Sequence, residues 1–134
     1  MKPPEEVKRD LVQRWLARAE EDFGVAEHIL DADVPYLFSV AFHAQQAAEK
    51  FLKAFLVHHQ IEFPKIHDLG KILDLANSVA PDMAKLLADV TSLNPYGVDV
   101  RYPGDIPEIT VADARAAVTM ATKVRNTVLG SLKG

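Results

Sequence analysis

The sequence predicts an all-α protein: an antiparallel up-and-down bundle of four to five helices, formed by a single domain over residues 1–134. Three observations support this fold class. Apolar residues recur at intervals of three and four along most of the chain, which is the period of an amphipathic helix. No segment shows the two-residue alternation of a strand. The connections between the expected helices are short, which favours antiparallel neighbours.

The first two helices carry the clearest patterns. The first is expected over about residues 7–31, and its apolar stripe is Val12, Leu16, Ala19, Phe23, Ala26 and Leu30. Residues 31–35 interrupt the spacing, and Pro35 can occupy the first turn of the next helix. The second helix is expected over residues 35–59, where alanine is abundant and allows neighbouring helices to approach closely.

Two shorter helices should follow. The third should begin near His67 or Asp68, with Asp68 as its N-cap or as an acid in its first turn. The fourth should begin near Pro81 and end by Asn94, because apolar residues between them again follow helical spacing.

A long irregular segment separates these helices from the last one. Residues 94–109 contain Pro95, Pro103, Pro107, Gly97 and Gly104. A loop of this length within a compact domain is often functional. The last helix should open at Thr110, because Thr110-x-x-Asp113 fits a capping-box pattern.

Composition excludes several classes of protein. Hydrophobic residues make up 49% of the chain and charged residues 25%, which is ordinary globular usage. No apolar run approaches the roughly 18 residues of a transmembrane helix, and the first ten residues are mostly polar, unlike a signal peptide. The absence of cysteine excludes disulfides, thiolate metal sites and cysteine nucleophiles. We therefore expect a cytoplasmic protein with no membrane partner.

The net charge and the absence of known motifs exclude further functions. The net charge of -4 at pH 7 argues against a globally basic nucleic-acid binder, and we expect no DNA partner. A local basic patch is still compatible with this net charge. No histidine has an acidic residue three positions before it, so the di-iron pattern of helical bundles is absent. Glycine-rich phosphate loops are also absent. We expect neither a metal nor a cofactor.

The most informative segment lies in the second helix. His43, Gln46, Lys50 and Lys53 share one helix face, and Glu49 can pair with Lys53 at a spacing of four. One interpretation is a solvated or dimer-facing stripe, since charged helix faces are commonly just solvated. The other is a cationic groove that meets phosphate groups.

Four blocks of the sequence, in order, resemble the HEPN domain family, named for a nucleotide-binding fold of higher eukaryotes and prokaryotes. The blocks are Ala19-Glu20-Glu21-Asp22-Phe23, residues 43–54, His67-Asp68-Leu69 and Arg101-Tyr102-Pro103. Ile66 stands where the family usually has threonine. The resemblance implies a helical bundle and a homodimer.

The resemblance implies two kinds of function. Many HEPN proteins are toxins that cut RNA with an arginine followed four to six residues later by histidine. Others partner a minimal nucleotidyltransferase in a toxin–antitoxin-like pair. No arginine here has a histidine at that distance; after Arg125-Asn126, Gly130 stands in the position of histidine. The chain is therefore expected to be a non-catalytic or degenerate nucleotide- or RNA-binding module, or a nucleotidyltransferase partner. The alternatives are an active ribonuclease toxin with a divergent site and a structural dimeric scaffold without ligand.

The candidate residues follow from these interpretations, and no catalytic residue is assigned. The candidates for binding nucleotide or phosphate are His43, Gln46, Lys50, Lys53, His67, Arg101 and Tyr102. Arginine can bind phosphate through two hydrogen bonds, and tyrosine can stack on a base. If the long loop folds over the second helix, several of these side chains would converge in a small basic pocket. The alternatives are a core histidine at position 43, a capping or turn residue at position 67, and a purely structural loop at positions 101 and 102.

Asp22 is expected to have a structural role. It lies beside the apolar stripe of the first helix, and an acid at an apolar seam needs a cationic partner. The candidate partners are Arg18, one turn earlier, and Lys50 or Arg101.

Overall fold

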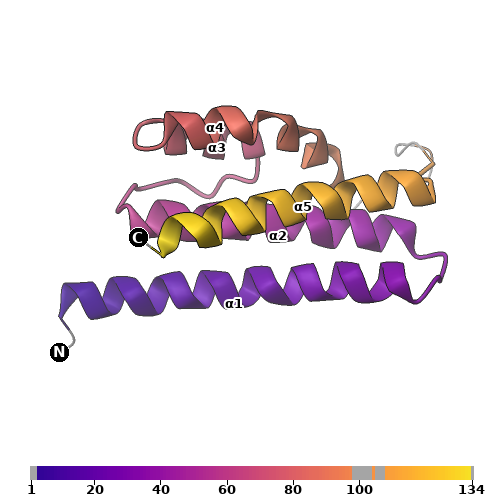
Figure 1. Ribbon diagram of the computed structural model, residues 1–134, viewed down its shortest axis with the longest axis horizontal. Helices are drawn as coiled ribbons and strands as arrows, with labels where there is room; N and C mark the ends of the chain where they lie inside the picture. Colours follow the sequence, from indigo (N-terminus) through magenta and orange to yellow (C-terminus); the bar gives the residue numbers. More distant parts are fainter. Residues whose placement is uncertain (1–2, 98–103, 105–107, 134) are drawn as a thin grey trace.

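The computed structural model describes residues 3–97, 104 and 108–133. Its elements are α1 (Pro4–Asp31), α2 (Leu37–His58), α3 (Leu69–Asn77), α4 (Pro81–Leu86), the 3₁₀ helix η1 (Ala88–Gly97) and α5 (Val111–Leu132). These ranges contain no strand, so the predicted all-α class is confirmed. The long helices α1, α2 and α5 lie alongside one another, and α3 and α4 form a short layer on the side away from α1 (Figure 1).

Helix α2 is the centre of the bundle. It contacts α1, α3, η1 and α5, and most of its residues are buried. Small residues such as Ala44 and Ala48 are fully enclosed and let the neighbouring helices approach closely, while Phe51 and Phe55 fill the space between them. On α1, most of the predicted apolar stripe packs on this core: Ala19, Phe23 and Ala26 are buried in it, and Leu16 and Leu30 are partly buried against it. Val12 is also buried, but it lies outside this cluster. The periodicity therefore identified the correct faces.

The two predicted helix caps are present. The side chain of Asp68 accepts a hydrogen bond from the Lys71 backbone N–H at 3.1 Å and caps α3. At the start of α5, the Thr110 hydroxyl accepts from the Asp113 N–H at 3.1 Å, and the Asp113 carboxylate accepts from the Thr110 N–H at 3.0 Å. The hydrogen bond from the Thr110 backbone N–H lowers the pKa of Asp113, and the bond with the Thr110 side chain lowers it further. Each cap satisfies N–H groups that the helix itself leaves unpaired.

The helix expected from Pro81 to Asn94 is wrong as a single element. The α-helix ends at Leu86, and the 3₁₀ helix η1 continues from Ala88 to Gly97. Leu87, Val90 and Leu93 are spaced by three and are buried. A 3₁₀ helix has three residues per turn, so it places all three side chains on one side. The same apolar residues also fit a helical spacing of three and four, which is why the sequence did not distinguish the two.

Two boundaries also differ from the prediction. Helix α1 begins at Pro4, with a proline in its first turn followed by Glu5 and Glu6, a combination that suits a helix start. Helix α2 begins only at Leu37, with Tyr36 as its N-cap, so Pro35 precedes the helix instead of occupying its first turn. None of the helices in the described part of the chain is both long and apolar enough to cross a membrane.

Candidate functional site on helix α2

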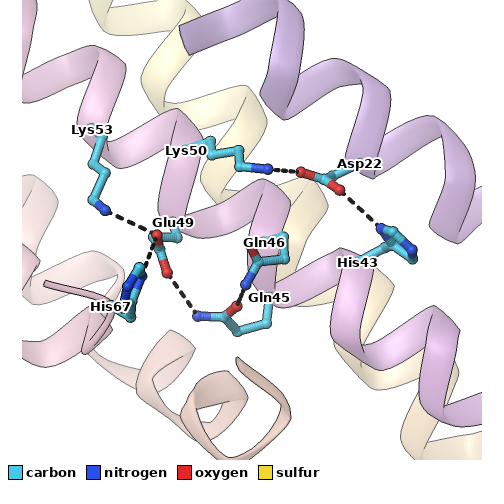
Figure 2. A network of polar contacts seen from close by, with 8 residues as sticks. All are labelled: Asp22, His43, Gln45, Gln46, Glu49, Lys50, Lys53 and His67. Carbon is cyan, nitrogen blue, oxygen red and sulfur yellow. Dashed lines mark hydrogen bonds and ion pairs between the residues drawn. The ribbon is translucent and has the colours of Figure 1, made fainter. Parts of the chain in front are cut away.

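Asp22 joins α1 to α2 through two side chains of the candidate stripe (Figure 2). Its Oδ1 lies 2.9 Å from His43 Nδ1, and its Oδ2 accepts a hydrogen bond from Lys50 Nζ. The predicted structural pairing of Asp22 with Lys50 is thus present. In the described ranges no ion pair joins Asp22 to Arg18, and Arg101 lies outside them.

The spacing along α2 explains why one carboxylate reaches both groups. His43 and Lys50 are seven residues apart, which is two helical turns, so they lie on one face with Asp22 of the antiparallel α1 between them. The three side chains are 30%, 23% and 13% exposed in the order His43, Lys50, Asp22. The ion pair of Asp22 and Lys50 is therefore partly desolvated yet accessible from solvent. We refer to these three residues as the Asp22 cluster.

A second group, the Glu49 cluster, consists of Glu49, Lys53, His67, Gln45 and Gln46. Glu49 Oε2 lies 2.9 Å from Lys53 Nζ and 3.0 Å from His67 Nδ1. Gln45 Nε2 lies 3.4 Å from Glu49 Oε1, and Gln46 donates to Gln45 Oε1 at 2.7 Å. The carboxylate thus has partners at both oxygens, as a buried charge requires.

Lys53 is enclosed instead of solvated. Its side chain is only 6% exposed, and Nζ lies 5.6 Å from the centroid of the Trp15 ring and 5.8 Å from that of Phe63. These two rings meet edge to face at 6.3 Å. The ammonium group is held by a carboxylate and two aromatic faces, which are favourable positions for a desolvated cation. The interpretation as a solvated stripe therefore does not apply to this residue.

His67 connects the segment before α3 to α2. Its side chain is 71% exposed even though Nδ1 contacts the buried Glu49. The next residue, Asp68, caps α3, and Asn94 of η1 accepts a hydrogen bond from the Leu69 N–H at 2.8 Å. This turn is therefore tied to both α2 and η1, in keeping with a turn role for His67.

Gly97 brings the end of η1 directly onto the Glu49 cluster. A Cβ at this position would lie 2.8 Å from Gln45 Cδ and 2.9 Å from Gln45 Nε2, closer than side chains tolerate. The glycine therefore permits the backbone to approach the fully buried Gln45. Arg101 and Tyr102 follow shortly after in the sequence, but both lie outside the described residues.

The predicted convergence of cations is only partly present. His43 and Lys50 contact Asp22, whereas Lys53 contacts Glu49 and therefore belongs to the other cluster. Gln46 belongs to the Glu49 cluster through its bond to Gln45 (Figure 2). The candidate face is therefore two separate polar clusters, of which the Asp22 cluster offers the more accessible cation.

Sequence reasoning missed an aromatic group beside His43. The Phe42 ring lies 5.3 Å from the imidazole and 6.4 Å from Phe38, which in turn lies 6.4 Å from Tyr96 of η1. All three aromatic residues are partly exposed. The spacing of four between Phe38 and Phe42 was the available signal, because it places both rings on one helix face.

The clusters have limited chemical options. In residues 3–97, 104 and 108–133, no group of three or more histidine, aspartate or glutamate side chains could hold a metal ion. His43 contacts Asp22 through Nδ1, and within these ranges Nε2 has no hydrogen bond. A carboxylate at Nδ1 favours the tautomer with its proton there, which makes Nε2 the ring nitrogen that carries the lone pair.

Comparison with known proteins assigns the fold. A family model described as HEPN domain matches residues 12–131. The chain belongs to the HEPN domain family. It is similar to the crystal structure of TT1696 from Thermus thermophilus, with 26% identity and a TM-score of 0.70 over 89% of this chain and 96% of that one. A search of curated proteins finds no match.

A second solved structure places the same fold in archaea. The chain is similar to ST0689, described as an archaeal HEPN homologue, with 27% identity and a TM-score of 0.69. The alignment covers 90% of this chain and 96% of that one. The resemblance that the sequence blocks indicated is therefore confirmed at the level of the HEPN family and its helical fold.

Proposed function

We propose that this HEPN domain is a non-catalytic module that binds a nucleotide or RNA, with the Asp22 cluster contacting phosphate. The observation that carries the proposal is that Asp22 holds His43 and Lys50 together on one partly exposed patch beside the Phe42 ring. A phosphate and a base need just such neighbours: hydrogen-bond donors for the oxygens and an aromatic face for stacking.

The donor count supports phosphate binding. An ammonium group has three N–H donors, and Asp22 takes one from Lys50, so two are available for phosphate oxygens. Asp22 also fixes both side chains before a ligand arrives, which reduces the entropy lost on binding. Its negative charge offsets the lysine, however, so the expected affinity is lower than that of an unpaired cationic pocket.

The environment of Arg125 supports the absence of the usual ribonuclease mechanism. Its guanidinium binds both oxygens of Glu20, with Nη2 at 2.9 Å from Oε2, and lies 5.5 Å from the Phe23 ring centroid. The bond to Glu20 raises the pKa of Arg125. The segment of this chain that is most similar to the arginine–histidine motif begins at Arg125. Its arginine is held in a structural ion pair, and Gly130 stands in place of the acid–base histidine.

A partner role is part of the same proposal. Some HEPN domain proteins partner a minimal nucleotidyltransferase in a toxin–antitoxin-like pair, and we propose that this chain is a homodimer in such a complex. Co-expression with a nucleotidyltransferase encoded next to it, followed by size-exclusion chromatography, tests this role directly. Elution of the two chains at separate volumes would exclude it.

One observation favours a second candidate function, that of a ribonuclease with a divergent site. An aspartate at His43 Nδ1, with no hydrogen bond to Nε2 from any described residue, is the arrangement that orients a histidine as general base. In this alternative, Nε2 would take the proton of an RNA 2′-hydroxyl as that oxygen bonds to phosphorus. The P–O5′ bond would break, solvent water would protonate the leaving 5′-oxygen, and Lys50 would stabilise the phosphate. Cleavage of a labelled RNA by the wild type, abolished in His43→Asn, would support it over the non-catalytic module.

Thermal unfolding with a panel of nucleotides and short RNAs tests the binding proposal. A ligand at 100 times its dissociation constant stabilises the folded state by about 2.7 kcal/mol, which corresponds to a rise of roughly 3–6 °C in Tm. We expect Lys50→Gln to remove the rise. Lys123→Gln is the matched control, because Lys123 also pairs with an aspartate, Asp89, at 3.1 Å but lies on α5. An equal rise in wild type and Lys50→Gln would reject the Asp22 cluster as the site.

A further inference from the structure

A pocket outside the Asp22 cluster lies at the opposite end of α1. It has a volume of about 460 Å³ and is bounded by the first turns of α1, the end of α2 and the last turns of α5. In Figure 1 the N-terminal turns of α1 extend beyond the ends of the other two helices. Its volume falls within the range of small-molecule sites.

The floor of this pocket is apolar. Val12 and Leu16 of α1 and Leu129 and Leu132 of α5 line it. Val12 is 6% exposed, while the three leucines are partly buried, so aliphatic surface is available at the base of the pocket. An aliphatic chain that covered these side chains would be favoured by removal of apolar surface from water.

The rim of the pocket is cationic. Lys8, Arg9 and Lys133 line it together with His58, and the acid among the lining residues, Glu5, is paired with Lys8 at 3.3 Å. In the described part of the chain, Arg9 and Lys133 have no ion pair. Because the chain as a whole has a net charge of -4, this concentration of positive groups is local.

The pKa of the neighbouring His59 is consistent with this positive environment. Burial lowers the pKa of His59, and His58 and Lys8 lower it further because they disfavour a second positive charge nearby. This supports the geometry of the rim, where an anion would be attracted and a cation repelled.

We propose that this pocket binds an anionic amphiphile, a small molecule with a carboxylate or phosphate head and an aliphatic body. The head group would lie between Arg9 and Lys133, and the aliphatic part would cover the leucines of α5. The size of the pocket, its apolar floor and its two cations, which have no ion pair with any described residue, all fit this one class of ligand. Binding here requires nothing of the Asp22 cluster.

Isothermal titration calorimetry with decanoate, below the concentration at which it forms micelles, tests the proposal. We expect one decanoate per chain, weaker binding of the uncharged decanol, and no heat with inorganic phosphate alone. Arg9→Gln should raise the Kd of decanoate about tenfold, the value of one charge-assisted hydrogen bond. Arg115→Gln is the matched control, because Arg115 is exposed on α5 and does not line the pocket.

Folding does not limit this experiment. Arg9 is exposed, so Arg9→Gln should keep the wild-type circular dichroism spectrum, and Lys133→Gln repeats the test on another helix. Equal affinity for decanoate and decanol, or an unchanged Kd in both variants, would overturn the proposal. So would the absence of binding together with a dimer that Leu132→Asp dissociates, because a second copy of the chain would then cover the pocket.

Discussion

Removal of the buried Lys53 ammonium should destabilise the fold strongly. Lys53 and Glu49 are only 6% and 4% exposed, so Lys53→Met leaves a carboxylate in the interior with His67 and Gln45 as its partners. Removing one partner of a buried ion pair lowers the free energy of unfolding by about 3–5 kcal/mol. Methionine has nearly the length of the lysine stem, so the loss of packing in this buried position should be small. We expect a loss near the lower bound, about 3 kcal/mol, because His67 still contacts Glu49.

Urea denaturation followed by circular dichroism measures this loss as a shift in the midpoint at constant slope. The matched control is Lys123→Met, whose ion pair with Asp89 is exposed and should contribute about 0–1 kcal/mol. Glu49→Gln in the Lys53→Met background should cost less than the two single substitutions added together, since it removes the unpaired charge. A loss of under about 1 kcal/mol in Lys53→Met, or strict additivity in the double variant, would refute the buried ion pair.

The remaining predictions concern the close approach of η1, the cap of α5 and the cationic end of the bundle. Gly97→Ala should cost about 1–3 kcal/mol, because its Cβ would overlap Gln45, whereas Gly130→Ala, with open space around it, should stabilise α5 by up to about 1 kcal/mol in the same urea assay; equal effects would contradict the contact. Thr110→Ala should cost about 0.5–2 kcal/mol at neutral pH. The folded state lowers the pKa of Asp113, mainly through the Thr110 backbone N–H that alanine retains, so the pH test needs Asp113→Asn: its cost should be present above the unfolded-state pKa and disappear as the pH falls through the folded-state value; a cost independent of pH would contradict the capping box. The lowered pKa of His59 means that the unfolded state binds its proton more readily, so stability should be full above pH 6.5 and fall as the pH drops below it; thermal unfolding of His59→Asn should show a weaker decline, and an unchanged decline would exclude this group.

The fold was largely predictable because its helices follow apolar periodicity and local capping chemistry. The apolar spacing from Val12 to Leu30 and the cap hydrogen bonds of Asp68 and Thr110 involve residues only three or four positions apart. The sequence alone therefore specifies them. The 3₁₀ helix was not predictable, since Leu87, Val90 and Leu93 fit either helical period and only packing against α2 distinguishes them.

The candidate site was predictable only in its composition. The residues on α2 were identified by spacing, and Asp22 by the need of an acid at an apolar seam for a partner. The division into two clusters depends on which acid each cation reaches, and this is a matter of helix pairing instead of local sequence. The contact of Gly97 with Gln45 and the position of Phe42 beside His43 are likewise tertiary. Arg101 and Tyr102 lie outside the described residues, so their part in the site stays a prediction.

The most direct test of phosphate recognition by the Asp22 cluster is an NMR titration of the labelled protein with a short single-stranded RNA. We predict saturable shifts of the His43 imidazole and Lys50 ammonium signals and of the Phe42 ring, which lie together on α2. The signals of His59, beyond the far end of the same helix, should stay unchanged. Shifts confined to the His59 end, or none at His43 and Lys50 at saturating RNA, would contradict the proposed site.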